Sequence, residues 1–166
     1  PAHIVELPRR GAFGGADDPA VRRRLERVIA AEPGAKIVLA GHSRGAVVAA
    51  DLAADLAAAG VPGLAGLVLI GTSHPREVDL SGLTIPVTKI VGTRDGLASP
   101  AEVMANAGLL PATTRWVWVE GGNHSQFGWY GFQPGDRRAT VPADEQRRQM
   151  LDALLSTLRQ LAAAAS

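Results

Sequence analysis

The chain has 166 residues, of which 46% are hydrophobic and 20% are charged, and its formal net charge is +1. This length and composition predict one soluble globular domain, residues 1–166, and the balanced charge gives no indication of a nucleic-acid partner. The absence of cysteine excludes disulfides, thiol nucleophiles and cysteine metal sites. No segment is long and apolar enough for a membrane span. We therefore expect a cytoplasmic protein, while a secreted or anchored form stays open.

Strands and helices alternate along the chain. Continuous apolar runs are typical of strands covered on both faces, and they predict strands at 3–7, 36–40, 67–71, 85–93 and 115–122. Apolar periodicity and capping signals predict helices at 19–31, 44–59, 100–110 and from 142 onward. This alternation predicts an α/β fold with a doubly wound, mostly parallel sheet.

Some of these predictions depend on named residues. Asp18 should cap the first helix, and Ser99 with Glu102 should form a capping box that opens the helix at 100–110. Trp116 and Trp118 should point to one face of the sheet and join the core. The closing helix should bury a stripe of large apolar residues, namely Met150, Leu151, Leu154, Leu155, Leu158 and Leu161.

Side chains able to carry chemistry follow three of the predicted strands. Ser43 comes after the strand at 36–40, Asp95 after the strand at 85–93, and His124 after the last strand. Functional groups gather beyond the carboxyl ends of parallel strands, so these three side chains are expected to meet. Serine, histidine and aspartate together are the nucleophile, the base and the orienting acid of acyl-transfer catalysis.

The segment Gly41-His42-Ser43-Arg44-Gly45 matches the Gly-x-Ser-x-Gly nucleophile elbow of the α/β-hydrolase superfamily, and the chain order Ser, Asp, His also matches. A side chain at either glycine is expected to collide with neighbouring backbone. Residues 92–100, residues 121–136 and the closing helix resemble a bacterial family related to the dienelactone-hydrolase-like enzymes. The chain departs from dienelactone hydrolases proper, which resemble a cysteine-nucleophile design.

The resemblance also implies an oxyanion hole. The backbone N–H of Arg44 would supply one donor at the start of the helix. In the family, further strands precede the one that resembles 36–40, and a loop from them gives the second donor. Within this chain the candidates are Ala12 and Phe13, provided that strand 3–7 pairs with strand 36–40. We favour instead a natural protein with an additional N-terminal segment. Unpaired strand edges would favour a homodimer.

Each candidate has a structural alternative. Asp95 could be only a turn residue before a glycine, and His124 could be a structural loop histidine. His42 is interpreted as a packing or loop-bonding residue, and His74 as a second choice for the base or as a pocket residue. Aromatic residues after His124 could form an apolar wall for a substrate or pin the loop to the body, namely Phe127, Trp129, Tyr130 and Phe132.

The expected function is hydrolysis of a small carboxylic ester without a metal or other cofactor. No pair of histidines has helical spacing, no acidic cluster surrounds one, and the glycine-rich stretch at 11–15 lacks the ending of a phosphate loop. The short connection between the strands at 67–71 and 85–93 leaves no room for a lid. Thioesters, lactones and amides use the same machinery. The alternatives are a non-catalytic binding domain and an acyltransferase or perhydrolase.

Overall fold

The structure is a computed structural model, and it describes residues 2–4 and 19–163. In this part of the chain, parallel strands form one sheet whose spatial order follows the sequence: β1 (Ile37–His42), β2 (Leu64–Ile70), β3 (Val87–Gly92) and β4 (Arg115–Val119). The strand predicted at 3–7 lies mostly outside the described residues, and residues 3 and 4 are not in a strand.

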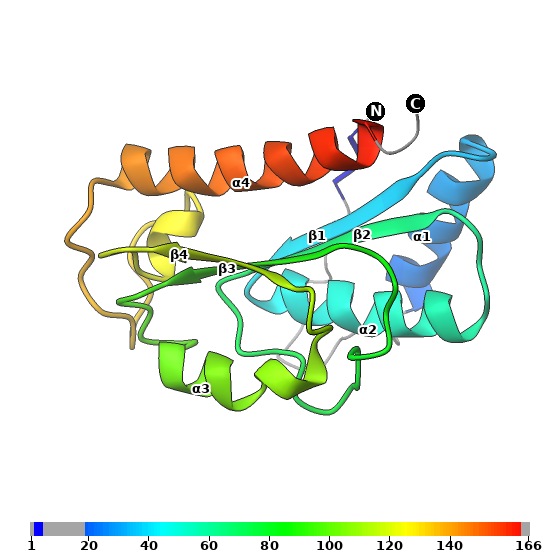
Figure 1. Ribbon diagram of the computed structural model, residues 1–166. Coiled ribbons are helices and arrows are strands. Elements are labelled where there is room, and N and C mark those ends of the chain that lie inside the picture. Colours follow the sequence, from blue (N-terminus) through cyan, green and yellow to red (C-terminus); the bar gives the residue numbers. More distant parts are fainter. Residues whose placement is uncertain (1, 5–18, 164–166) are drawn as a thin grey trace.

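Helices cover both faces of the sheet, as the α/β prediction requires. Figure 1 shows α4 on one face and α2 and α3 on the other. The described helices are α1 (Pro19–Ala31), α2 (Arg44–Ala58), α3 (Pro100–Ala105) and α4 (Ala143–Ala163), with short 3₁₀ turns η1 (Ala107–Leu109) and η2 (Ser125–Phe127). The connection between β2 and β3, residues 71–86, contains no helix. The α/β prediction without a lid is therefore confirmed.

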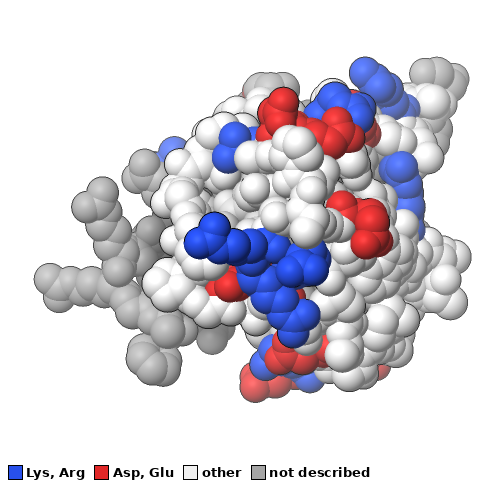
Figure 2. Space-filling view, turned by 90° about the vertical axis from the view of Figure 1, so that its left-hand side faces the viewer, with Lys and Arg blue, Asp and Glu red and all other residues white. Residues whose placement is uncertain are grey.

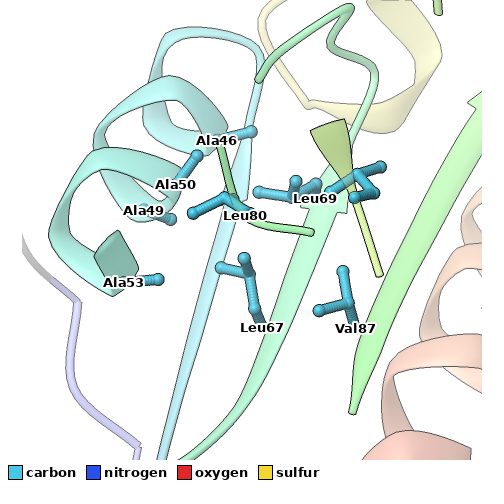
Figure 3. Close-up of a cluster of buried hydrophobic side chains, with 9 residues drawn as sticks. Ala46, Ala49, Ala50, Ala53, Leu67, Leu69, Leu80 and Val87 are labelled. Atoms are coloured by element: carbon cyan, nitrogen blue, oxygen red, sulfur yellow. The ribbon is translucent and has the colours of Figure 1, made fainter. Parts of the chain in front are cut away.

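Small side chains let α2 pack closely on β2. The buried residues of α2 that face the sheet are alanines, which form helices readily and leave room for the leucines of the strand. Figure 3 shows these alanines pointing toward Leu67 and Leu69, with Leu80 and Val87 closing the cluster. The outer face of α2 contacts α1, where Val21 and Leu25 are buried. The alanine-rich sequence after Ser43 therefore fixes the distance between helix and sheet.

The opposite face of the sheet is covered by α4, with a different stripe from the one predicted. The buried residues of α4 are Gln146, Met150, Ala153 and Thr157, at successive spacings of four, three and four. Three leucines of the predicted stripe are rotated away from the sheet and are 40–43% exposed, namely Leu151, Leu155 and Leu158. The prediction is confirmed for Met150, which is buried, and Leu154 packs against the same cluster. It was wrong for the three exposed leucines, because the face of α4 that meets the sheet also contains Gln146, Ala153 and Thr157.

The start of α3 was predicted correctly, whereas its end was not. The capping box is confirmed, since Ser99 Oγ accepts from Glu102 N at 3.3 Å and Glu102 Oε2 accepts from Ser99 N at 3.0 Å. However, α3 ends at Ala105, because Asn106 leaves helical geometry and bonds the carbonyl of Ser73 at 3.0 Å.

The tryptophans of β4 lie on the same side of the strand, as predicted, and their rings stack at 6.0 Å. Trp116 packs against the core around α2. Trp118 is 41% exposed, so its prediction as a core residue is wrong. No described strand pairs with the outer edge of β4, and this position at the margin of the sheet leaves Trp118 uncovered.

A buried hydroxyl pair between β3 and α4 provides a test of this packing. Thr88 Oγ1 and Thr157 Oγ1 lie 2.8 Å apart, and Thr157 Oγ1 also donates to Ala153 O at 3.1 Å. Thr157→Val removes the acceptor for Thr88 and leaves a buried donor without a partner, which costs about 1–3 kcal/mol. Thr88→Val should cost less, because Thr157 still donates to Ala153. Urea denaturation measures the free energy of unfolding of both variants. Equal losses of stability would contradict the assignment of Thr88 as the donor and Thr157 as the acceptor.

Candidate active site

Ser43 lies in the sharp turn that joins β1 to α2. Its backbone has φ 54° and ψ −121°, and it is the one residue other than glycine with a positive φ in the described ranges. Such strain costs about 1–3 kcal/mol and persists only where the surroundings impose it. Here the Ser43 N–H donates to Ile70 O at 3.0 Å, and the Ser43 carbonyl accepts from Ala46 N at 3.0 Å. The serine is thereby held at the carboxyl end of the sheet.

Gly41 makes this turn possible. A Cβ at Gly41 would overlap the carbonyl group of Gly45 and would lie 2.5 Å from the backbone nitrogen of Ala46. The prediction that Gly45 is needed for the same reason is wrong, because a Cβ there meets no atom of the described chain within 4 Å. Gly41 therefore allows the start of α2 to pack directly against the end of β1.

A hydrogen bond joins Asp95 and His124. Nδ1 of His124 lies 3.0 Å from Oδ2 of Asp95, and the two side chains are 2% and 0% exposed, respectively. Oδ1 of Asp95 accepts from the N–H groups of Leu97 at 2.8 Å and Ala98 at 2.7 Å. Asp95 therefore closes its own turn with one oxygen and contacts the histidine with the other. A role as a turn residue is thus compatible with a role as the partner of His124.

The chain segments that leave β3 and β4 meet through close backbone packing. A Cβ at Gly92 would lie 2.5 Å from the carbonyl oxygen of Gly122, and the same oxygen accepts from Arg94 N at 2.8 Å. Asp95 and His124 follow these two contacts directly. Their hydrogen bond therefore depends on a glycine at the end of β3.

His124 also lies next to the serine turn. Its ring centroid is 4.7 Å from that of His42, the residue before Ser43. Nε2 of His124 is buried and has no hydrogen-bond partner, so Ser43 Oγ does not bond to it in this conformation. His74 Nδ1 lies 3.5 Å from Thr72 Oγ1, and the His74 ring bonds to no carboxylate of the described chain. Of the two candidate bases, only His124 is paired with an acid.

Comparison with known proteins identifies the family. Residues 18–148, most of the chain, match the family model described as the Alpha/beta hydrolase family. The chain belongs to this family. No curated protein sequence is significantly similar to it.

Solved structures of two relatives share the fold of this α/β-hydrolase. An alpha-beta serine hydrolase homologue from Coxiella burnetii is 21% identical, with a TM-score of 0.55 over 69% of this chain and 54% of its own. MGS-MChE2, an alpha/beta hydrolase enzyme from the sediment metagenome of the Mar Chica lagoon in Morocco, is 19% identical, with a TM-score of 0.50 over 64% of this chain and 61% of its own. The chain therefore spans 54–61% of the length of these relatives.

Asp136 joins the two loops of the α/β-hydrolase that carry Asp95 and His124. Its Oδ1 accepts from Gly96 N at 3.0 Å and His124 N at 3.3 Å, and its Oδ2 accepts from Ser125 N at 2.8 Å and Ser125 Oγ at 2.7 Å. Burial raises the pKa of Asp136, but hydrogen bonds from Ser125, Gly96 and Arg137 outweigh it and lower the pKa below its ordinary value. Sequence analysis missed Asp136 because its partners are mostly backbone groups.

Gln146 supports the histidine loop from the side of α4. Its Nε2 donates to Asn123 O at 2.6 Å, and its Oε1 accepts from Asn123 N at 3.1 Å. The side chain is fully buried, at a position where the helix pattern predicts an apolar residue. The sequence contained a signal for this role: a glutamine on the apolar face of α4 would be buried, and a buried amide needs hydrogen-bond partners.

Lys89 is a second buried polar residue that the sequence analysis missed, because it lies within an apolar strand. It lies in β3, is 1% exposed, and donates through Nζ to the carbonyl oxygen of His74. Burial lowers its pKa to about 7. This contact ties the connection between β2 and β3 to the sheet.

The aromatic residues after His124 have different environments. Phe127 is 2% exposed and packs in the core beneath α4, which favours the interpretation that it pins the loop. Trp129, Tyr130 and Phe132 are more than half exposed, and Tyr130 stacks on His42 at 6.0 Å. Trp129 and Tyr130 stay predictions as substrate contacts.

The remaining candidates concern the oxyanion hole and ligands. Arg44 is the first residue of α2, whereas Ala12 and Phe13 lie outside the described residues, as does the helix cap Asp18. Within residues 2–4 and 19–163, no group of three histidine or acidic side chains is arranged to hold a metal ion. No helix in the same ranges is long and apolar enough to cross a membrane.

Alanine at the two glycines of the turn should have opposite effects. Gly41→Ala forces the backbone of β1 and α2 apart and should cost about 1–3 kcal/mol or more, because the overlap is with backbone. Gly45→Ala lies within α2 in open space and should be neutral or stabilise by up to about 1 kcal/mol. Thermal denaturation of both variants measures the difference. Similar stability of the two would contradict the close contact at Gly41.

His42 should make the folded state sensitive to mild acid. Burial, followed by the charge of neighbouring His124, lowers the pKa of His42 from 6.5 to about 4, against smaller opposing effects of Asp95, the His124 backbone and Asp136. The unfolded chain therefore binds a proton first as pH falls, and stability is lost between pH 6.5 and 4. The loss should be of the order of 2–3 kcal/mol.

His42→Phe keeps a ring in this position and removes the titration. The difference in unfolding free energy between pH 7 and pH 4.5 should shrink in this variant, whatever its absolute stability. His3→Gln, at an exposed position, is the matched control and should keep the wild-type difference. An unchanged pH dependence in His42→Phe would show that other groups cause the acid sensitivity.

Proposed function

We propose that this α/β-hydrolase is a serine hydrolase that cleaves a carboxylic ester through Ser43, His124 and Asp95. The main support is the buried Asp95–His124 pair with an unpartnered Nε2, beside a strained serine turn. A base needs a free lone pair on one ring nitrogen for the serine proton. Nε2 of His42 is also buried without a partner, but within the described residues only His124 combines a free Nε2 with a carboxylate on Nδ1. Catalytic hydrogen bonds often shorten only when substrate binds, so the missing Ser43–His124 bond is compatible with this role.

In the first half of the reaction, Ser43 Oγ attacks the carbonyl carbon of the ester, and its proton passes to Nε2 of His124. Oδ2 of Asp95 accepts the hydrogen bond from Nδ1–H, fixes this tautomer and stabilises the imidazolium. The tetrahedral intermediate collapses when the ester C–O bond breaks. The leaving alkoxide takes the proton from Nε2 and departs as an alcohol, while the acyl group stays on Ser43.

In the second half, water attacks the acyl group on Ser43. Nε2 of His124 accepts the proton of this water, and the carboxylic acid leaves as Oγ is protonated again. The free enzyme is thereby restored without any cofactor.

The oxyanion of both intermediates would be stabilised at the start of α2. The backbone N–H of Arg44 belongs to the first turn, where N–H groups point along the helix toward the site and the helix dipole favours negative charge. We propose Ala12 or Phe13 as the source of the second donor. One such donor contributes about 10²–10³ in rate.

The substrate class proposed is a small soluble ester, since the β2–β3 connection carries no helix that could cover the site. The similarity to dienelactone-hydrolase-like enzymes is part of this proposal. Asp136 and Gln146 would act as positioning residues, because they hold the loop of His124 through its backbone.

The test is covalent labelling of Ser43 by a fluorophosphonate probe. Wild-type protein should be labelled and should hydrolyse 4-nitrophenyl acetate, whereas Ser43→Ala should lose labelling and more than about 10³-fold in kcat/KM. Ser81→Ala, in an exposed loop, is the matched control and should behave as wild type. Unchanged melting temperatures would exclude unfolding as the cause.

Other outcomes distinguish the alternatives. Wild-type protein that is neither labelled nor active would indicate a non-catalytic binding domain. Labelling of Ser43 with faster transfer to an added alcohol or to peroxide than to water would indicate an acyltransferase or a perhydrolase. Labelling that persists in Ser43→Ala would remove this serine from the mechanism.

A further inference from the structure

Arginine side chains gather at the carboxyl end of the sheet, around the loop that follows His124. The arginine cluster consists of Arg94, Arg137, Arg138 and Arg147. Nε of Arg94 donates to Arg138 O at 2.8 Å, and Arg138 and Arg147 line one cavity. Figure 2 shows this end of the molecule, with basic side chains near the middle of the face and acidic side chains around them.

Within residues 2–4 and 19–163, the guanidinium groups of the cluster have no carboxylate partners. No carboxylate of the described chain lies within 4 Å of any of them, whereas Arg22 and Arg76 each pair with one carboxylate and Arg148 pairs with two. The acidic residue on this loop is Asp136, whose oxygens already accept hydrogen bonds from Gly96, His124, Ser125 and Arg137. The cluster is therefore a concentration of positive charge that an anion would relieve.

The cavity between these residues has a volume of about 370 Å³, enough for a small organic molecule. It is lined by Asn123, Ser125, Gln126, Gly131, Phe132, Arg138, Ala139 and Arg147. Its lining therefore offers an aromatic ring and two guanidinium groups.

Some polar side chains that line the cavity already use their hydrogen-bonding groups within the protein. Asn123 uses its amide on Arg137 O and Gln126 N, and Gln126 donates to Gln146 and to Val141 O. The side chains of the two lining arginines are the remaining strong donors.

Arg147 is held in position at the cavity. Its Nη2 donates to Gly128 O at 3.1 Å, its Nε lies 3.3 Å from Gln126 O, and its guanidinium group lies 4.6 Å from the ring centroid of Trp129. Because this guanidinium group is already held in place, it loses little further conformational entropy when it binds a ligand. Arg138 is exposed, and its side chain makes no hydrogen bond within the described part.

We propose that this cavity binds a carboxylate or phosphate group, held by Arg138 and Arg147, with any apolar part of the ligand against Phe132. Arginine forks match both groups because each presents two oxygens in one plane. The anion is either the acidic end of the ester substrate or a separate small molecule. The first version rests on the proposed ester hydrolysis, and anion binding itself does not.

The binding test uses benzoate and inorganic phosphate, with benzamide as the neutral analogue of benzoate. Isothermal titration at constant ionic strength should give saturable binding of at least one anion and none of benzamide. Arg138→Gln should weaken this binding about ten- to a hundred-fold, as expected for loss of a charge-assisted contact. Arg115→Gln, at the opposite end of the sheet, is the matched control and should bind as wild type.

Binding that is absent in wild type, or equal in Arg138→Gln and Arg115→Gln, would overturn the proposal. These titrations need no turnover, so they stand even if the protein hydrolyses no ester. Melting temperatures of both variants in chloride should match that of wild type, because Arg138 donates no hydrogen bond to the described chain.

A second measurement separates the two sources of the anion. If the anion is part of the substrate, Arg138→Gln should raise KM for the monoester of 4-nitrophenol with glutaric acid about tenfold and leave that of 4-nitrophenyl butyrate unchanged. If the anion is a separate molecule, both esters should respond equally to the variant. Either result supports the site once the titrations have shown binding.

Discussion

The hydrogen bond between Asp95 and His124 depends on a backbone contact that neither side chain makes. Gly92 ends β3 against the carbonyl of Gly122, and the N–H of Arg94 bonds to the same carbonyl. With any larger residue at Gly92, the two chain segments would separate, and a bond of 3.0 Å could not survive a separation of this kind. The geometry of the buried pair is therefore set by a glycine three residues before the aspartate.

The loop of His124 is held by two polar side chains, one on α4 and one on the loop that follows His124. Gln146 reaches it from α4 and binds both the N–H and the carbonyl of Asn123, whereas Asp136 collects N–H groups from two loops. Buried groups of this kind stabilise only when every donor and acceptor is satisfied. Burying these polar side chains is unfavourable, but their hydrogen bonds to the loop compensate for it. The same hydrogen bonds fix the orientation of His124.

The same loop has a second side, where the arginine cluster lies. Asn123 and Ser125, on either side of His124, line the cavity of Arg138 and Arg147. The buried histidine thus lies between the serine turn and a positively charged surface. The proposed hydrolysis and the proposed anion site therefore share the segment 123–125.

The sequence by itself determined the alternating elements, the capping box at Ser99, and the placement of Ser43, Asp95 and His124 after three of the strands, because these follow from local propensity and apolar periodicity. Tertiary structure decided which face of α4 is buried, that Gly41 and not Gly45 is sterically required, and that Asp136 and Gln146 support the histidine loop. These depend on contacts between residues far apart in the chain. A close backbone approach or a carboxylate shared by two loops leaves no periodic trace in sequence, since it exists only after the strands have paired.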